Sequence, residues 1–323
     1  MKNYPPFSVT PLILTFCQQI SRELGYFAGA NMAQAPIKLR RANKIKTIQS
    51  SLAIEGNTLS IEQITAILAG KRVLGPKKDI VEVNNALLVY EDLAKYNPSL
   101  AKDLLRAHKV LMKNLNAEAG KYREKGVGVF DGTKVAHMAP PAKRLPYLMT
   151  ELFNFLKSSS GVSWLIKACV FHYELEFIHP FEDGNGRMGR LWQQLLLMKE
   201  DAVFEYVSVE SIIKSNQKKY YKVLGQCDKA GTSTLFIEFM LGQILSSLKT
   251  YSKITKPQKI NAAFRLKNAK KKIIGKWFSR KEYMQANIDM SSATASRDLL
   301  NGAKKGLLIK KGDKNQLKYK FGA

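Results

Sequence analysis

Cysteines and long apolar runs are scarce in this sequence of 323 residues. No stretch reaches the about 18 consecutive apolar residues that a membrane-spanning helix needs, so no membrane contact is expected. The first residues, Met-Lys-Asn-Tyr-Pro-Pro, lack the basic and then apolar layout of a secretory signal. Three widely separated cysteines without metal-ligand spacing (Cys17, Cys169 and Cys227) are typical of core thiols in a reducing compartment. These absences predict a soluble, cytoplasmic protein.

Strand-forming patterns are also few, and no internal repeat of fixed period is present. Apolar residues instead recur at three- and four-residue intervals, as amphipathic helices require. A single hairpin is expected at 127–139, because an Asp-Gly turn separates two short β-prone runs there. The sequence therefore predicts a mainly α fold. The clearest helical segments are 11–24, 60–69, 81–94, 102–115 and 145–156.

Acidic residues are in short supply, since 52 Lys and Arg stand against 26 Asp and Glu, a net charge of +26. Residues 251–323 hold 19 of the basic residues against 4 acidic ones, a net charge of +15. Residues 1–250 hold the other 33 against 22, a net charge of +11. A basic segment of this kind favours a polyanionic partner, with nucleic acid as the first candidate. A solvated, lysine-rich surface has the same composition.

Residues 251–260, rich in Ser, Thr and Lys with Pro257 among them, are predicted to be a linker. The segment 261–323 then forms a small unit of three helices followed by a basic hairpin, which predicts a winged helix-turn-helix domain. Units of this type bind duplex phosphates, dock proteins or dimerise. The cations suited to a duplex are Arg297, Lys310, Lys311, Lys314, Lys318 and Lys320.

The segment 179–190, HPFEDGNGRMGR, joins two helical patterns at 161–178 and 187–198. The residue before Pro180 is pushed out of the helical region, so the first helix ends there. A glycine-rich turn then opens the second helix. Its backbone N–H groups and the positive end of the helix dipole form a phosphate site. Glycine at 184 and 186 removes the Cβ atoms that would keep phosphate oxygens away.

Charged side chains complete this predicted phosphate site. Arg187 and Arg190 lie three residues apart, so both are placed to reach the same helix end with guanidinium groups suited to phosphate. Asp183 offers the hard oxygen ligand that Mg²⁺ prefers when phosphates share it. His179 is a residue type that accepts a proton near neutral pH.

The string His-x-Phe-x-Asp-Gly-Asn-Gly-Arg-x-x-Arg resembles the signature of the Fic family of AMP-transferring enzymes, and all eight specified positions match. The resemblance implies that His179 deprotonates a target hydroxyl, which attacks the α-phosphate of ATP and expels pyrophosphate. It implies Mg²⁺ at Asp183 and an inward-packed Phe181 that fixes the loop. It also implies a γ-phosphate on Arg190. The residues implied to cradle or support the phosphates are Gly184, Asn185, Gly186 and Arg187.

Other interpretations of the same residues are weaker. Asp-Gly-Asn-Gly alone is most often a surface turn. An EF-hand fails because Met188 and Gln194 stand where glycine and glutamate are required. His172, Glu176 and His179 do not follow the order of the His-Glu-x-x-His zinc motif.

Upstream, Ser51-Leu-Ala-Ile-Glu-Gly56 is similar to the inhibitory pattern Ser/Thr-x-x-x-Glu-Gly/Asn of the same family, although a capped helix with a C-terminal glycine explains it equally well. The resemblance implies that Glu55 pairs with Arg190 and takes the place of the γ-phosphate. A desolvated carboxylate–guanidinium pair is costly to break. We therefore expect an autoinhibited enzyme.

The resemblance spans roughly residues 5–230 and implies an N-terminal helical region at 1–98 and a Fic-type helical bundle as catalytic core at 99–250. The hairpin 127–139 would be the flap that holds the target segment by main-chain pairing. Tyr220 is implied to line the base and ribose of the nucleotide. Homodimers are common among relatives with this layout.

Three alternatives remain open at this stage. The chain is a DNA-binding regulator whose Fic domain senses nucleotide, or it transfers another phosphate-linked group, or it uses a different nucleotide such as UTP or GTP. The target protein is expected to carry a hydroxyl side chain.

Overall fold

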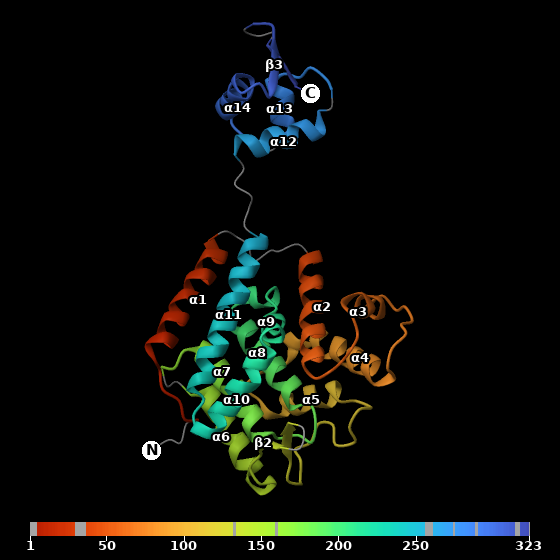
Figure 1. The fold of residues 1–323 in the computed structure, drawn as a ribbon, viewed down its shortest axis with the longest axis vertical. Helices are drawn as coiled ribbons and strands as arrows, with labels where there is room; N and C mark the ends of the chain where they lie inside the picture. Colours follow the sequence, from red (N-terminus) through yellow and green to blue (C-terminus); the bar gives the residue numbers. More distant parts are fainter. Residues whose placement is uncertain are drawn as a thin grey trace. The chain divides into compact units, whose positions relative to one another are not determined.

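The computed structural model describes residues 5–29, 37–131, 134–158, 161–255, 261–273, 275–287, 290–313 and 317–322. The chain divides into two compact units, Met1–Thr255 and Lys256–Ala323 (Figure 1). Helices dominate both units, which confirms the mainly α prediction. No helix within the described residues is long and apolar enough to cross a membrane.

Unit 1 is a bundle of helices around two that are almost wholly buried, α7 (Trp164–Ile178) and α8 (Asn185–Glu200). These two pack against each other, and α1 lies beside α11 at the side of the bundle (Figure 1). One apolar core gathers α1, α7 and α11, and a second gathers α2, α4, α5 and α8. The remaining α-helices of the unit are α1 (Pro11–Gly29), α2 (Ile37–Ile54), α3 (Ile61–Leu68), α4 (Lys77–Glu91), α5 (Ala101–Leu111), α6 (Leu145–Lys157), α9 (Val209–Ser215), α10 (Gln217–Ala230) and α11 (Thr234–Thr255).

Local sequence explains several helix ends. Ser60 and Gln63 form a reciprocal capping box that starts α3. The joint between α7 and α8 follows from His179-Pro180, as predicted, although α7 begins at Trp164 and α8 already at Asn185. Short 3₁₀ turns occur at η1 (Leu93–Lys95), η2 (Ala142–Arg144) and η3 (Ala202–Glu205).

The predicted hairpin is present as β1 (Gly128–Asp131) paired antiparallel with β2 (Lys134–Met138). The register shifts between Val129 and Phe130. A bulge of this kind increases the local twist of a strand pair and is common next to active sites.

The predicted linker began too early. Helix α11 continues to Thr255, because Tyr251 and Ser252 are buried against the bundle and extend its apolar face. Residues 256–260 lie outside the described residues. The predicted division between 98 and 99 falls inside unit 1 and stays a prediction.

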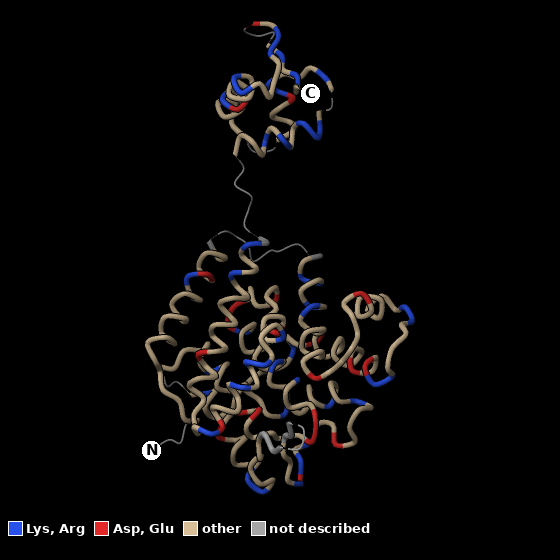
Figure 2. The backbone as a smooth tube through the Cα atoms, in the orientation of Figure 1, with Lys and Arg blue, Asp and Glu red and all other residues tan. Residues whose placement is uncertain are grey.

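Unit 2 contains α12 (Ala262–Lys272), α13 (Arg280–Ala286), α14 (Ser292–Lys304) and an antiparallel pair, β3 (Leu308–Lys311) and β4 (Lys318–Phe321). Its small core is formed around Leu266, Phe278, Tyr283 and Leu299. Three helices and then a strand pair follow one another in the predicted order. Lysines and arginines are spread over α12, α14 and β3 (Figure 2). Lys314 lies outside the described residues, and the winged-helix assignment stays a prediction.

Candidate active site

His179 ends α7 in the left-handed region, with φ 49° and ψ 59°. This backbone turns the imidazole out of the helix, where its Nδ1 lies 3.2 Å from the carbonyl oxygen of Glu176. Within the described residues, no hydrogen bond engages its Nε2. The carbonyl oxygen of His179 accepts a hydrogen bond from Arg123 Nε at 2.7 Å. The position of His179 is thus fixed through the main chain, and one ring nitrogen stays available.

Arg123 is buried and ties several segments together. Besides His179, its guanidinium donates to the carbonyl oxygens of Lys125 and Pro140, at 2.7 and 2.6 Å, and its backbone N–H donates to the carbonyl of Pro180. One cation therefore joins the loop after α7 to the segment after the hairpin.

The loop that follows His179 rests on the fully buried ring of Phe181. This ring stacks on His108, with centroids 3.7 Å apart. Asn185 closes the loop, because its side chain both accepts from and donates to the main chain of Phe181 at 2.9 Å. Phe181 and Asn185 thus shape the turn in front of α8.

His108 supports the same loop from α5. Its Nδ1 accepts a hydrogen bond from Gly120 N–H at 2.8 Å, so its Nε2 carries the proton and donates to the carbonyl oxygen of Asp183 at 3.0 Å. Burial lowers the pKa of His108 to about 4. A neutral ring with this tautomer holds the turn over the whole physiological pH range.

The two glycines of the turn serve different purposes. Gly184 has φ +86°, and a Cβ there would lie 2.8 Å from Met112 Sδ. A Cβ on Gly186 would lie 2.5 Å from Glu55 Oε1, so this carboxylate oxygen lies directly over the main chain of Gly186. The first amides of α8 have no acceptor within their own helix and face this region. That these amides bind phosphate stays a prediction.

Arg187 and Arg190 reach different partners. Arg187 is buried and donates to Glu82 Oε1 at 2.9 Å and to Asp183 Oδ1 at 2.8 Å. Both guanidiniums nevertheless lie near the start of α8, because Arg187 contacts Asp183 in the turn before the helix and a Cβ on Gly186 would lie 3.1 Å from Arg190 Nη1. Asp183 itself is half exposed.

Arg190 contacts the segment that the sequence marked as inhibitory. Its Nη2 lies 2.7 Å from Glu55 Oε1 and donates to the carbonyl oxygen of Ser51, and its Nε donates to Ser51 Oγ at 3.1 Å. The Arg190 side chain is 1% exposed. Burial opposes its charge, but Glu55, Tyr220 and Glu176 raise the pKa of Arg190 above its ordinary value. Gly56, with φ +91°, ends the segment and lets the chain turn away.

A cavity of about 820 Å³ opens in front of these groups. This volume lies within the about 300–1,000 Å³ of small-molecule sites. The residues that line it come from α2, β2, α7, α8 and α10, and they include Glu55, His137, Glu176, His179, Gly186, Arg190, Lys218, Tyr221 and Asp228.

Tyr220 belongs to the wall of this cavity. It is only 1% exposed, and its hydroxyl lies 3.0 Å from His172 Nε2 and 3.2 Å from Glu176 Oε1. The neighbouring Tyr221 lines the same cavity and is 47% exposed. Of the two tyrosines, Tyr221 therefore has the surface with which to contact a base.

The hairpin is held to the cavity by His137. Its Nε2 lies 2.8 Å from the carbonyl oxygen of Phe177, and its Nδ1 lies 2.9 Å from Asp228 Oδ2. Both ring nitrogens face acceptors, an arrangement that favours imidazolium. Burial opposes that charge, but Asp228 outweighs it and raises the pKa of His137.

The electrostatics of His179 suit a base. Burial lowers the pKa of His179, and the positive charges of His137 and Arg123 lower it further, while Glu176 acts in the opposite direction. Its ring lies 6.4 Å from that of His137, between centroids. The imidazole is therefore neutral at physiological pH.

Asp183 is the residue best placed to hold a divalent cation. Mg²⁺ is commonly bound through one or two carboxylates, with substrate phosphates and water as its other ligands. A half-exposed carboxylate beside the open amides of α8 fits that donor set. Within the described residues, no group of three or more acidic, His or Cys side chains forms a cage for a metal.

Comparison with known proteins places this geometry in a family. A model of the Fic/DOC family matches residues 98–197. A crystal structure of a Fic family protein from Desulfovibrio desulfuricans G20 is 38% identical, covers 98% of both chains and superposes with a TM-score of 0.75. This chain belongs to the Fic family.

Several relatives of this Fic-family chain are named Protein adenylyltransferase Fic. That of Aedes aegypti is 30% identical over 226 residues, which are 65% of this chain and 43% of the relative. That of Drosophila virilis is 31% identical over 251 residues, or 73% and 49%. The chain thus spans less than half the length of these relatives. Fic-1 of C. elegans shares the fold, with a TM-score of 0.60 at 22% identity over 76% of this chain.

Within the Fic fold, the structure brings most of the predicted site residues together. His179, Gly186, Arg190, Tyr220 and Glu55 line one cavity. Asp183, Gly184, Asn185 and Arg187 lie in the turn and first helical turn beside them, and Ser51 contacts Arg190. Sequence reasoning missed Glu82, His108, Arg123 and Asp228. Glu82, His108 and Arg123 lie 105, 75 and 56 residues from the site residues they bind, and no local pattern marks them or Asp228.

Proposed function

We propose that this protein transfers AMP from ATP to a hydroxyl side chain of a target protein. The observation that carries the proposal is the arrangement of one neutral, partly unengaged imidazole (His179) beside an amide-lined helix start and Arg190 in a single cavity. The names of the relatives support the same chemistry.

In the proposed reaction, Nε2 of His179 accepts the proton of the target hydroxyl, and the hydroxyl oxygen attacks the α-phosphorus of ATP. The bond from this phosphorus to the bridging oxygen breaks, and pyrophosphate leaves with the electron pair. The amides of 185–187 and the guanidinium of Arg190 stabilise the negative charge of the phosphates. Mg²⁺ held by Asp183 would neutralise phosphate charge. His137 and Arg123 keep the hairpin and His179 at a fixed separation.

We also propose that the protein is inhibited by its own α2. Glu55 occupies the space over Gly186 and the Nη2 of Arg190, where the γ-phosphate would lie. ATP then binds without the alignment that in-line attack requires. Ser51 strengthens the contact through a second nitrogen of the same guanidinium.

The decisive experiment is intact-mass measurement after incubation with ATP and Mg²⁺, with a model hydroxyl peptide and the chain itself as acceptors. We expect Glu55→Gly to gain AMP at least about ten times faster than wild type, which corresponds to about 1.4 kcal/mol. Adding His179→Ala to Glu55→Gly should slow transfer by about 10²–10⁴, the usual contribution of a general base.

Two controls make the result specific. Binding of a non-hydrolysable ATP analogue to Glu55→Gly/His179→Ala should match its binding to Glu55→Gly, because the imidazole acts on the acceptor. Replacing ATP by UTP or GTP tests which nucleotide the protein uses. If all variants gain AMP at the wild-type rate, the proposal that His179 is the base and the proposal that Glu55 inhibits transfer are both wrong.

A second candidate function is DNA binding by unit 2, with the Fic domain as a nucleotide sensor. The net charge of +15 in residues 251–323 and the exposed Arg297 and Lys310 favour it. A homodimer, by resemblance to the family, and a cytoplasmic site of action, from the cysteine pattern and the N-terminal residues, remain part of the proposal. A regulator of this kind would bind DNA in a manner that changes with ATP, whereas an enzyme would label its acceptor regardless of DNA.

A further inference from the structure

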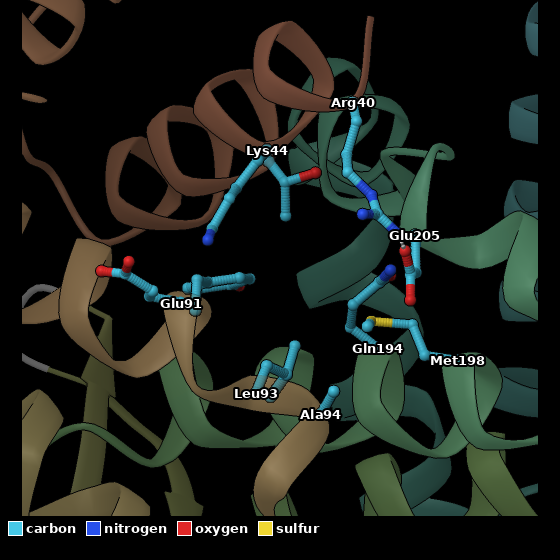
Figure 3. Close-up of a pocket in the computed structure, with 10 residues that line it drawn as sticks. Arg40, Lys44, Glu91, Leu93, Ala94, Gln194, Met198 and Glu205 are labelled. Carbon is cyan, nitrogen blue, oxygen red and sulfur yellow. Dashed lines mark ion pairs between the residues drawn. The ribbon is translucent and has the colours of Figure 1, made fainter. Parts of the chain in front are cut away.

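A second cavity, of about 230 Å³, lies in unit 1 between α2, α4, η1, α8 and η3. Both cavities have walls near α2 and α8. They share no other element and no lining residue. Figure 3 shows its walls, with α2 on one side and the turn that carries Leu93 and Ala94 on the other.

Two pairs of oppositely charged side chains line this cavity. Arg40 and Glu205 form an ion pair on one side. Lys44 and Glu91 lie on the other side, and the Lys44 amine extends into the cavity (Figure 3). Burial lowers the pKa of Lys44, while Glu91 acts against that lowering. Within the described residues, no ion pair or hydrogen bond engages the Lys44 amine.

The rest of the lining is mostly apolar. Leu93, Ala94, Met198 and Tyr90 also line it. Gln194 also lines the cavity, and its Oε1 is buried without a hydrogen-bond partner. A buried carbonyl oxygen of this kind is costly unless a donor reaches it.

We propose that this cavity binds a free amino acid with a small apolar side chain. Its carboxylate would pair with Lys44, its ammonium with Glu91 or Gln194, and its side chain would cover Leu93 and Met198. The cavity, of about 230 Å³, is smaller than the about 300–1,000 Å³ of drug-sized sites, which favours a small ligand.

The position of this site gives it a regulatory consequence, which rests on the proposed function. Arg40, Lys44, Thr47, Ser51 and Glu55 are spaced by three or four residues, so they share one face of α2 and its last turn. The cavity residues occupy the first part of that face, and the residues that hold Arg190 occupy the last part.

Tyr90 joins the two parts. It lines the cavity, and its hydroxyl is buried where the charges of Glu210 and Arg190 act on it. An amino acid in the cavity would add contacts between α2, α4 and α8. It would therefore hold Glu55 on Arg190 and strengthen the inhibition.

The first test is isothermal titration calorimetry of the full chain without nucleotide, with L-valine as the probe. We expect saturable binding with a Kd of about 1 mM or tighter, weaker binding by about tenfold or more in Lys44→Met, and no change in Lys46→Met, an exposed lysine of the same helix. Isovalerate, which lacks the ammonium, and isobutylamine, which lacks the carboxylate, should bind at least tenfold more weakly. No saturable binding of alanine, valine, leucine or methionine, or equal binding by Lys44→Met, would overturn the site.

The second test measures the coupling by hydrogen exchange, which does not depend on catalysis. We expect saturating L-valine to slow exchange of the amides at 44–55 in wild type and to have no effect in Lys44→Met. Unchanged exchange in a protein that binds valine would overturn the link to α2. Failure of AMP transfer would leave both measurements intact, so the two proposals are tested separately.

Discussion

At the scale of single residues, the turn before α8 depends on one glycine. Gly184→Ala would place a methyl group 2.8 Å from Met112 Sδ in a left-handed backbone conformation. We expect a loss of about 2–4 kcal/mol in the free energy of unfolding, from backbone strain and overpacking together. Urea unfolding measures it.

The matched control is Gly225→Ala in α10. A Cβ there meets no atom within 4 Å, and the backbone is helical. This change should stabilise by about 0.5–1 kcal/mol, because alanine favours helix over glycine. Equal effects at the two positions would contradict the account of the turn.

His179 gives a prediction about pH. The neutral imidazole is the active form, so AMP transfer should fall as pH drops through its pKa, which lies below the ordinary 6.5. Removing the neighbouring positive charge with His137→Gln raises the pKa of His179, so the acidic limb should move to higher pH. The measurement is kcat/KM against pH in the Glu55→Gly background. His137→Lys keeps the positive charge, so the acidic limb of its pH profile should lie closer to that of the protein with His137.

How well the sequence predicted the site differs from residue to residue. The signature predicted His179 and Asn185 because each acts on its own loop, within four residues. The partner of Arg187 was not predictable, since Glu82 lies 105 residues away on α4. The sequence also could not choose between Tyr220 and Tyr221, because helical spacing alone does not reveal which ring is covered by Phe236 and Phe239.

At the scale of elements, the Arg190 guanidinium on α8 binds the end of α2 through two residues, Ser51 and Glu55. Ser51→Ala removes the acceptor of Arg190 Nε and leaves Glu55 in place. We expect AMP transfer to rise by about fivefold, as one hydrogen bond of about 1 kcal/mol implies, and to stay below that of Glu55→Gly. Initial rates of transfer from labelled ATP measure this order.

The double variant checks the physical reason. In Ser51→Ala/Glu55→Gly the inhibitory contact is already broken, so the second change should add little. A rise of the same factor in both backgrounds would mean that Ser51 acts elsewhere than through Arg190.

At the scale of the whole molecule, periodicity predicted most helices because their apolar faces pack on a common core. The end of α11 was missed because polar residues such as Ser252 are buried there. Serine and threonine in a sequence are typical of a linker, and only the packing shows that they continue a helix. The hairpin was found because its turn is local.

The uneven distribution of charge along the chain leads to a prediction about the salt dependence of DNA binding. If unit 2 binds duplex phosphates, the logarithm of the association constant should fall linearly with the logarithm of salt concentration. Changing Lys310 and Lys311 to glutamine should lower the slope by about 1.8, or 0.9 for each lost contact. Lys125→Gln, an exposed lysine of unit 1, serves as the control. A slope that no lysine change alters would exclude this mode of binding.

Arg123 has a consequence for substrate choice. The same guanidinium donates to the carbonyl of His179, the proposed base, and to the carbonyl of Pro140 behind the hairpin. A polypeptide that fits the hairpin poorly and pushes it outward would also displace the imidazole of His179. We therefore expect unsuitable proteins to be rejected by misalignment of the proton acceptor, so that recognition and chemistry fail together.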